Sequence, residues 1–252
     1  MNFKAVGATD VGKIREANED AFFLDEENRL FIVADGMGGH QGGGYASKKS
    51  LEIVQNELKR LEQSQEMTQP IKAGAGFSLS QLRLARAIQQ ANLVLFETSI
   101  KEPSLRGMGT TLTALLFDEN YANLAHIGDS RAYLIRQGKI QQLTEDHSWV
   151  QEQVRTGVLT LEEAKNHPLK NIITRSLGHE REIKIDLLKV EYQVKDRFLL
   201  CSDGLSNMVS DQEILEVIEQ FELEKIPGHL VERANQEGGY DNITIVVVEV
   251  IA

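Results

Sequence analysis

The sequence predicts an α+β fold in which largely antiparallel β-sheets pack as a sandwich that is flanked by helices. Three short turn-rich segments each separate two apolar segments, which is typical of β-hairpins. Two segments between the hairpins instead repeat apolar residues at helical spacing. The chain has 252 residues, 41% of them hydrophobic. We expect residues 1–252 to form a single domain.

The first strand is expected at residues 3–8, and three hairpins follow it. They comprise residues 21–24 with 30–34, residues 110–117 with 121–127, and residues 131–136 with 139–142. Strands that are joined by such short turns favour antiparallel pairing.

Two helices are predicted between the first and second hairpins. Residues 44–61 repeat leucine and valine every three or four positions, which places them on one helix face. The second helix begins after Ser78, because Ser78 and Gln81 form a capping-box sequence. Residues 64–76 between the two helices are expected to form a loop.

Residues 146–178 are expected to form a mostly helical insertion between two strands. The next strands are predicted at residues 183–190 and 197–201. Two helices follow them, one capped by Ser210 and Glu213 and the other opening at Pro227. The last strand, residues 243–250, shows little alternation and should lie in the interior of a sheet.

Four aspartates stand at the ends of predicted strands. Apolar segments lead into Asp35, Asp129 and Asp203, and Asp241 comes shortly before the last strand. If these ends meet, two like charges ~4 Å apart repel by roughly 4 kcal/mol at an effective dielectric constant of about 20. Hard divalent cations that bind through oxygen remove this cost. The pattern therefore favours a metal site, although each aspartate alone is also typical of a turn.

Other kinds of site fit the sequence less well. The glycine-rich residues 36–44 lack the Gly-Lys-Ser/Thr of a phosphate-binding loop. Gly128-Asp129-Ser130 resembles a serine esterase motif, but no Asp-x-x-His closes the chain as that reading requires. The lone cysteine, Cys201, lies in an apolar segment and has Asn207 where a cysteine phosphatase needs arginine.

Charge and hydrophobicity exclude two classes of partner. The formal net charge of −11 argues against nucleic acid, whose binders neutralise phosphates with lysine and arginine. The longest late apolar segment, residues 243–248, is far shorter than the ~20 residues that cross a bilayer. We therefore expect a cytoplasmic protein that binds neither nucleic acid nor membrane.

An ordered series of short motifs resembles the bacterial metal-dependent serine/threonine phosphatases of the protein phosphatase 2C type. The series extends from near the first residue to near the last, which makes it more specific than any single motif. It comprises Arg15-x-x-Asn18-Glu19-Asp20, Val33-Ala-Asp35-Gly36-Met-Gly-Gly-His40, Gly109-Thr-Thr111, Gly128-Asp129-Ser130-Arg131, Asp146-His147-Ser148, Ser202-Asp203-Gly204-Leu205 and Asp241-Asn242-Ile-Thr244.

The resemblance implies a four-layer α-β-β-α sandwich, with two central antiparallel sheets and helix pairs outside. It also implies a centre of two Mn²⁺ or Mg²⁺ ions, with Asp35 bridging both. The carbonyl of Gly36 would bind one ion, and Asp203 and Asp241 would bind the other. Glu19 and Asp20 would act through bound waters. A third ion would take Asp129 as a ligand and share Asp203.

The implied reaction is direct attack on phosphorus by a hydroxide that bridges the two ions. Metal binding can lower the pKa of the water that supplies this hydroxide from 15.7 to about 7. Arg15, a planar fork of donors, suits a bidentate grip on the phosphate. The alternative to this phosphate-binding role is that Arg15 forms a surface ion pair with Glu16 or Glu19. His40 is a candidate for protonating the leaving alkoxide. The eukaryotic pattern, however, has histidine directly after Asp-Gly, where this chain has Met37, so His40 is alternatively a loop histidine bonded to a carboxylate.

Residues 146–178 match the part of the family called the flap, which varies between members and is linked to substrate choice. His167 and Arg175 are the candidates there for contacting a peptide. We expect a monomeric phosphatase that acts on phosphoserine and phosphothreonine in proteins and opposes a eukaryotic-like kinase. A metal-binding regulatory module without catalysis is one alternative. A phosphodiesterase or nuclease is another, but the net charge speaks against a basic groove.

Overall fold

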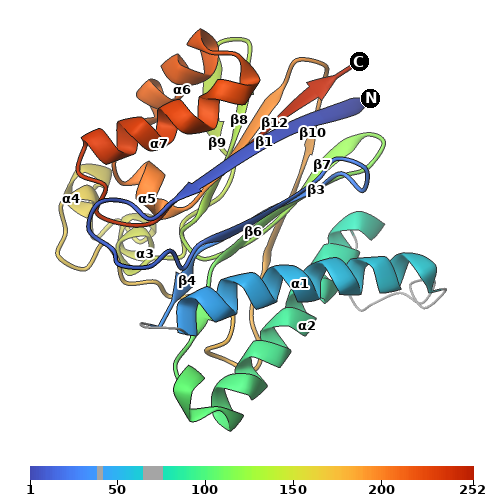
Figure 1. The fold of residues 1–252 in the computed structure, drawn as a ribbon, viewed down its shortest axis with the longest axis vertical. Helices are drawn as coiled ribbons and strands as arrows, with labels where there is room; N and C mark the ends of the chain where they lie inside the picture. Colours follow the sequence, from blue (N-terminus) through green and yellow to red (C-terminus); the bar gives the residue numbers. More distant parts are fainter. Residues whose placement is uncertain (39–41, 65–75) are drawn as a thin grey trace.

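Two five-stranded antiparallel sheets lie at the centre of the computed structural model, which describes residues 1–38, 42–64 and 76–252 (Figure 1). Sheet A runs in the order β1 (Asn2–Asp10), β12 (Ile243–Ile251), β11 (Arg197–Cys201), β8 (Arg131–Arg136) and β9 (Lys139–Gln142). Sheet B runs in the order β10 (Asp186–Glu191), β7 (Tyr121–Ile127), β6 (Leu112–Phe117), β3 (Leu30–Ala34) and β2 (Ala21–Asp25). A two-stranded ladder of β4 (Gly36–Met37) and β5 (Gly109–Thr110) extends beyond sheet B.

Helices cover the outer face of each sheet (Figure 1). On sheet B lie α1 (Gly42–Gln63) and α2 (Leu79–Lys101), and on sheet A lie α6 (Asp211–Gln220) and α7 (Ile226–Gln236). Shorter elements are α3 (Trp149–Arg155), α4 (Leu161–Lys165), α5 (Asp203–Ser206) and the 3₁₀ turns η2 (Pro103–Leu105) and η3 (Leu223–Lys225). The predicted four-layer α-β-β-α sandwich is confirmed.

Three apolar layers hold the four layers together. The layer between the two sheets is aromatic, and Phe117 lies at its middle. The ring centroid of Phe117 lies 4.3 Å from that of Phe3 and 5.2 Å from that of Phe198. Edge-to-face arrangements such as that of Phe117 with Phe198 are favourable between aromatic rings. The interior strand β12 contributes to this layer with one face and to the layer under α7 with the other.

Local signals fixed most helix boundaries correctly. Ser78 caps α2, Thr160 caps α4 and Ser210 caps α6, each in a complete capping box. The three hairpins form as expected, and β12 lies between two other strands, as its pattern predicted. The predicted loop of residues 64–76 falls largely outside the described residues.

The prediction that residues 146–178, the flap, are mostly helical was wrong. Only α3 and α4 are helical there, with seven and five residues. Gly157 follows α3 with a φ of +75°, a conformation that ends a helix. Pro168 follows α4 closely and cannot continue it. Among the helices that the structure describes, none has an apolar stretch long enough to cross a membrane.

Candidate metal centre

The four strand-end aspartates gather at one end of the two sheets. Asp35 follows β3, Asp129 comes shortly after β7, and Asp203 comes shortly after β11 as the first residue of α5. Asp241 precedes β12, and β12 runs antiparallel to β11, so the start of β12 lies beside the end of β11. The charges of the other three aspartates all act on Asp35, and Asp203 lies within hydrogen-bonding reach of Asp35. The strand ends therefore meet.

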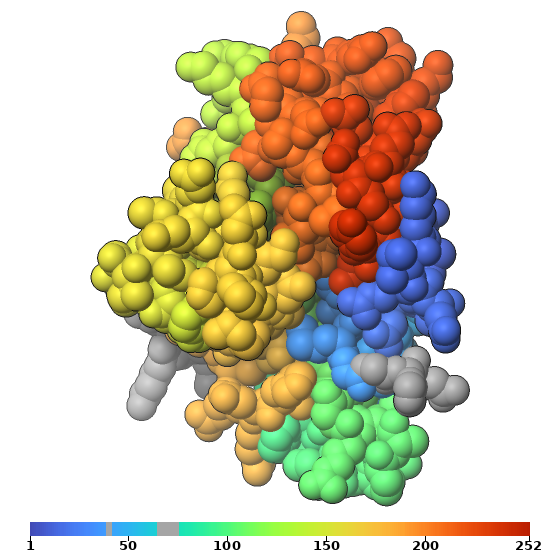
Figure 2. Space-filling model, turned by 90° about the vertical axis from the view of Figure 1, so that its left-hand side faces the viewer, coloured from blue at the N-terminus to red at the C-terminus, as the bar shows by residue number. Residues whose placement is uncertain are grey.

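Figure 2 looks at one side of the molecule, where the flap (yellow) lies across from the N-terminal segment (blue) and the C-terminal part of the chain (orange and red). The N-terminal loop and the segment before β12 are fastened together. The backbone N–H of Lys13 donates to the carbonyl of Gly239 over 2.7 Å. Gly12 has a φ of +76°, and a Cβ there would lie 2.3 Å from the carbonyl oxygen of Asp241. Only glycine allows the two segments to approach so closely.

Burial raises the pKa of four carboxyl groups in this centre, those of Asp20, Asp35, Asp129 and Asp203. The pKa values of Asp35 and Asp129 lie well above the usual range, because burial disfavours their charged forms and the neighbouring carboxylates add repulsion. Burial and the charge of Asp241 raise the pKa of Asp203 to about 6. Burial raises that of Asp20 to about 7, although the hydroxyl of Ser202 bonds to it. Without a cation, these charges are poorly accommodated.

Several carboxylate oxygens in the centre have no hydrogen-bond partner among the residues that the structure describes. Oε1 of Glu19, Oδ1 of Asp20 and Oδ1 of Asp129 are buried and accept no hydrogen bond within the part of the chain that the structure describes. A buried oxygen of this kind costs free energy unless it is paired or binds a metal. Hard divalent cations prefer carboxylate oxygens, so these residues fit Mn²⁺ or Mg²⁺.

The arrangement is open and does not form a closed cage of donors. Among the described residues, no three histidine, cysteine or acidic side chains form a ready-made metal cage. Mg²⁺ usually keeps several waters and takes only one or two carboxylates from the protein. Asp35 and Asp203 are both partly open to solvent. An ion that binds there could therefore keep waters and remain accessible to a substrate.

Arg15 pairs with one of the acidic residues of the centre. Its Nη2 donates to Oδ2 of Asp241 over 2.7 Å, and the Arg15 side chain remains 53% exposed. The alternative from the sequence was an ion pair with Glu16 or Glu19, and the guanidinium bonds to neither in the structure. The hydrogen bond to Asp241, more than the desolvation that opposes it, raises the pKa of Arg15. The guanidinium thus lies on the solvent-exposed side of the acidic centre, in contact with Asp241.

Two polar residues that the sequence did not single out as site residues hold the acidic pair Glu19 and Asp20 in place. Asn242 accepts from the backbone N–H of Glu19 over 2.8 Å, and its amide donates to the carbonyls of Val11 and Ala17. Ser202 donates from its hydroxyl to Oδ2 of Asp20 over 2.7 Å. Both directly adjoin a strand-end aspartate in the sequence, which is the signal that could have identified them.

The segment that carries Asp35 is held by two threonines. The backbone N–H of Asp35 donates to Oγ1 of Thr111, and the hydroxyl of Thr110 donates to the carbonyl of Asp35, each over 2.9 Å. Gly36 lies against the start of α1, where a Cβ would stand 2.2 Å from the carbonyl oxygen of Gly43. These contacts leave the backbone beside Asp35 little freedom.

The buried His147 connects the segment of Asp129 with the start of β10. Nδ1 of His147 accepts from the N–H of Gly128 over 3.0 Å, so the ring proton resides on Nε2 and is donated to Asp186 over 3.1 Å. Burial lowers the pKa of His147, which keeps the ring neutral. Arg175 lies 3.1 Å from the same Nε2, but two donors cannot bond, so its partner is Asp186 at 3.2 Å.

The remaining candidate residues lie on or beside the flap. The ring of His167 packs against Trp149 in a tilted arrangement with ring centroids 5.0 Å apart, and its Nδ1 accepts from the N–H of Leu169. Arg175 is engaged by Asp186, as described above. His40, the candidate general acid, lies outside the described residues.

The chain is similar to known proteins over nearly its whole length. Residues 14–237 match the family model described as protein phosphatase 2C. A serine/threonine phosphatase of Listeria monocytogenes, named stp, is 40% identical, and the match covers 96% of this chain and 93% of that one. The serine/threonine protein phosphatase PstP of Mycobacterium tuberculosis is 41% identical over 96% of this chain and 44% of its own length.

Solved structures agree with these sequence matches. The crystal structure of the M. tuberculosis phosphatase PstP superimposes with a TM-score of 0.85 and 38% identity, covering 100% of both chains. A second structure, of the PstP catalytic domain in complex with two manganese ions, has a TM-score of 0.84 at 37% identity, covering 100% of this chain and 99% of that one.

Proposed function

The chain belongs to the protein phosphatase 2C family and is a protein-serine/threonine phosphatase, and we propose that its acidic centre binds Mn²⁺ or Mg²⁺ to hydrolyse phosphoserine and phosphothreonine esters in proteins. The observation that carries this proposal is the meeting of Asp35 and Asp203 among buried carboxylate oxygens that have no hydrogen-bond partner in the described part of the chain. The PstP structure with two manganese ions supports the choice of metal.

The metal ligands we propose are the residues expected from the sequence. They are Asp35, the carbonyl of Gly36, Asp203 and Asp241 for two ions, Asp129 for a third, and Glu19 and Asp20 through waters. When bound, such cations supply the Lewis acidity that makes a water nucleophilic at neutral pH. The unpartnered oxygens of Glu19, Asp20 and Asp129 support this assignment.

Arg15 would hold the phosphate. Asp241 engages only Nη2, so the other donors of the fork are available to phosphate oxygens at the open edge of the centre. Asp241 would thereby orient the guanidinium before the substrate arrives. This preorganisation reduces the entropy that is lost when the phosphate binds.

His40 remains our candidate for protonating the leaving alkoxide. His40→Ala should slow hydrolysis of phosphopeptides more than that of an aryl phosphate, whose leaving group needs no proton. Equal slowing of both substrates would contradict the role of His40 as the general acid.

His167 remains a candidate for contacting the peptide. If so, His167→Ala should change the ranking among phosphopeptides, whereas a uniform effect would point to its packing against Trp149.

Phosphoproteins as substrates require a serine/threonine kinase that produces them, and we propose a eukaryotic-like kinase as the opposing partner. We further propose that the protein acts as a cytoplasmic monomer with residues 146–178 as the flap of a single domain. Light scattering on a sizing column tests the monomer directly.

The deciding experiment is phosphate release from a phosphothreonine peptide with Mn²⁺, with chelator, and with Asp203→Ala. We expect metal-dependent turnover that the substitution abolishes. Asp211→Ala, at an exposed position at the start of α6, is the matched control and should retain turnover. No turnover by the folded, metal-loaded protein would instead favour a regulatory module without catalysis.

A further inference from the structure

Two of the strand-end aspartates stand on strands that do not touch each other. Asp35 follows β3 and Asp129 comes shortly after β7, and β6 lies between these two strands and is hydrogen-bonded to both. Neighbouring strands lie about 4.8 Å apart, so the ends of β3 and β7 are roughly 10 Å apart. A residue at the start of β6 is therefore placed to contact both ends.

Thr111 occupies this place, directly before β6. Its N–H donates to the carbonyl of Asp35 over 2.8 Å, and its Oγ1 accepts from the N–H of Asp35 over 2.9 Å. The same Oγ1 lies 2.7 Å from Oγ of Ser130, the residue after Asp129, and either hydroxyl can donate. Both side chains are fully buried. One side-chain hydrogen bond thus joins the segment of Asp35 to the segment of Asp129.

The chain turns at Gly128 so that the residues after it lie against β6. Gly128 has a φ of +112°, and a Cβ there would lie 2.5 Å from the side chain of Thr111. Glycine is required on both grounds. The carbonyl of Ser130 also accepts from the hydroxyl of Thr113 in β6 over 3.3 Å. The backbone on both sides of Asp129 is therefore held by the start of β6.

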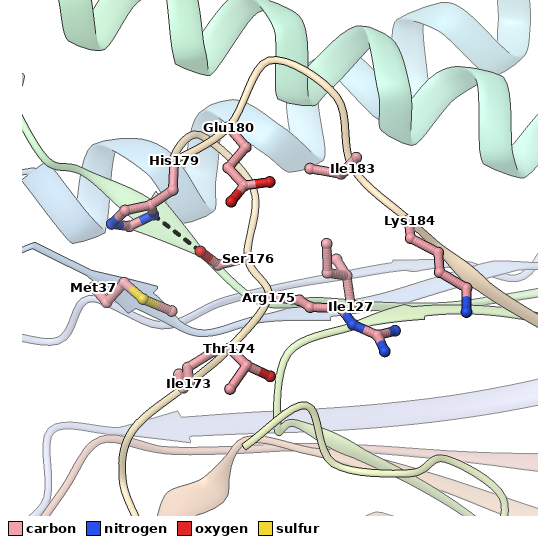
Figure 3. Close-up of a pocket in the computed structure, with 10 residues that line it drawn as sticks. All are labelled: Met37, Ile127, Ile173, Thr174, Arg175, Ser176, His179, Glu180, Ile183 and Lys184. Carbon is pink, nitrogen blue, oxygen red and sulfur yellow. Dashed lines mark hydrogen bonds between the residues drawn. The ribbon is translucent and has the colours of Figure 1, made fainter. Parts of the chain in front are cut away.

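The flap holds the residue before Asp129. His147 donates from its N–H to the carbonyl of Gly128 over 2.7 Å, in addition to accepting from the N–H of the same glycine. Where the end of β7 meets the flap, Ile127 and Thr174 are among the residues that line a pocket of about 380 Å³ (Figure 3). The described residues that line it include no proposed metal ligand, so the pocket does not hold the carboxylate of Asp129.

The carboxylate of Asp129 itself is left for a ligand. Its Oδ1 is buried and accepts no hydrogen bond from the residues that the structure describes. After burial, the charges of neighbouring carboxylates, that of Asp129 among them, raise the pKa of Asp35, so the two groups repel each other when both are ionised. This repulsion tends to move the two segments apart. The hydrogen bond between Thr111 and Ser130 opposes that movement.

We propose that the hydrogen bond between Thr111 and Ser130 fixes the separation of the two aspartates, so that both can bind cations at the same time. The inference rests on the proposed function, in which Asp35 and Asp129 are metal ligands. Thr111 and Ser130 act as positioning residues, since their buried hydroxyls bond to each other and are closed to a substrate. This gives the serine of Gly128-Asp129-Ser130 a role other than that of a nucleophile.

The first experiment measures the binding of Mn²⁺ alone, without substrate, from the electron paramagnetic resonance signal of the free ion. Ser130→Ala breaks the bond and leaves that of Thr111 with Asp35 in place. We expect it to weaken the binding of the ion that Asp129 holds about 10- to 100-fold, the usual cost of losing a residue that orients a metal ligand. Asp129→Asn identifies that ion by removing it. Wild-type affinity in Ser130→Ala, or an unchanged isotherm in Asp129→Asn, would overturn the proposal.

Further variants separate positioning from general stability. Thr111→Ser keeps the hydroxyl and should bind Mn²⁺ as the wild type does, whereas Thr111→Val should not. This pair also gives the answer if Ser130→Ala does not fold. Because Ser130 acts through Asp129, adding Ser130→Ala to Asp129→Asn should weaken the remaining ions no further. Additional weakening in the double variant would contradict the positioning role.

The matched control is Ser50→Ala. It removes another fully buried hydroxyl, one that bonds to the carbonyl of Ser47 within α1, and should leave Mn²⁺ binding unchanged. A loss of affinity as large as that of Ser130→Ala would mean that any buried hydroxyl matters equally, and the assignment to Ser130 would fail.

Turnover of a phosphothreonine peptide then connects binding with activity. In Ser130→Ala, the Mn²⁺ concentration that gives half-maximal turnover should rise by the same factor as the dissociation constant, and kcat should recover at saturating Mn²⁺. A kcat that stays low there would count against positioning. If the wild type binds Mn²⁺ but hydrolyses nothing, the proposed function fails and the binding comparison still decides this inference. A folded wild-type protein that binds no Mn²⁺ would refute both.

Discussion

Nη2 of Arg15 donates a hydrogen bond to Oδ2 of Asp241 over 2.7 Å, although 226 residues separate the two in the chain. One partner is a proposed phosphate ligand and the other a proposed metal ligand. The bond fixes the guanidinium at the edge of the acidic centre and leaves part of its fork free. Arg15 can therefore be replaced while every proposed metal ligand is retained.

Arg15→Ala should lower kcat/KM for phosphopeptides about 10- to 100-fold, since a hydrogen bond to a charged group contributes roughly 1.5–3 kcal/mol. Stability should change by less than about 1 kcal/mol, because the ion pair is exposed. Arg233→Ala breaks another exposed ion pair, with Glu213, away from the centre and should leave kcat/KM unchanged. Steady-state kinetics and thermal unfolding check both statements. An Arg15→Ala enzyme within twofold of the wild type would exclude the phosphate role.

The pair also shows where sequence reasoning reaches its limit. The aspartates at strand ends could be predicted because the signal is local: an apolar segment, then an acid beside glycine. The partner of Arg15 could not be predicted, because the only candidate partners that the sequence suggests are nearby residues such as Glu16 and Glu19. Tertiary structure brings Asp241 beside Arg15 through the backbone bond of Lys13 with Gly239.

The same distinction holds elsewhere in the fold. Hairpins and capping boxes were predicted correctly because each is completed within a few residues. The contact of His147 with Gly128 and Asp186 joins three separate segments, and nothing near His147 in the sequence indicates it. The helical content of the flap was overestimated because residue pattern alone does not show that Gly157 takes a positive φ.

Gly36→Ala should disrupt the centre through sterics alone. The new methyl group would lie 2.2 Å from the carbonyl oxygen of Gly43 and 2.5 Å from that of Glu19. We expect a loss of about 1–3 kcal/mol in the free energy of unfolding and the loss of Mn²⁺-dependent turnover. Gly228→Ala in α7 is the matched control. Apart from its chain neighbours and the backbone of its own helix, no described atom lies within 4 Å of the new methyl group, so the free energy of unfolding should rise by about 0.5–1 kcal/mol. Equal effects of the two substitutions in urea unfolding would refute the argument.

Asp203→Asn should make the metal-free protein more stable while it abolishes turnover. The substitution removes a charge that partial burial and the repulsion by Asp241 disfavour, which together raise the pKa of Asp203 to about 6. At about pH 8 in chelator, we expect a gain of up to about 3 kcal/mol in the free energy of unfolding. Asp211→Asn, at an exposed position, should show neither effect. A variant that is no more stable than the wild type in chelator would mean that the carboxylates do not repel one another.

The stability of the metal-free protein should fall as the pH rises from about 4 to about 7. The raised pKa values of Asp35, Asp129, Asp203 and Asp20 mean that the folded state binds more protons than the unfolded state in this range. The slope of the unfolding free energy with pH is then negative, so acid stabilises the fold until the unfolded aspartates also protonate near pH 4.

Mn²⁺ supplies positive charge that offsets the repulsion between the carboxylates. The increase in the free energy of unfolding on adding Mn²⁺ should therefore be larger at about pH 8, where the carboxylates are ionised, than at about pH 5.5. Thermal unfolding at the two pH values, with chelator and with Mn²⁺, measures all four states. A metal-free protein that becomes more stable between pH 5.5 and 8 would show that the carboxylates are not charged neighbours in solution.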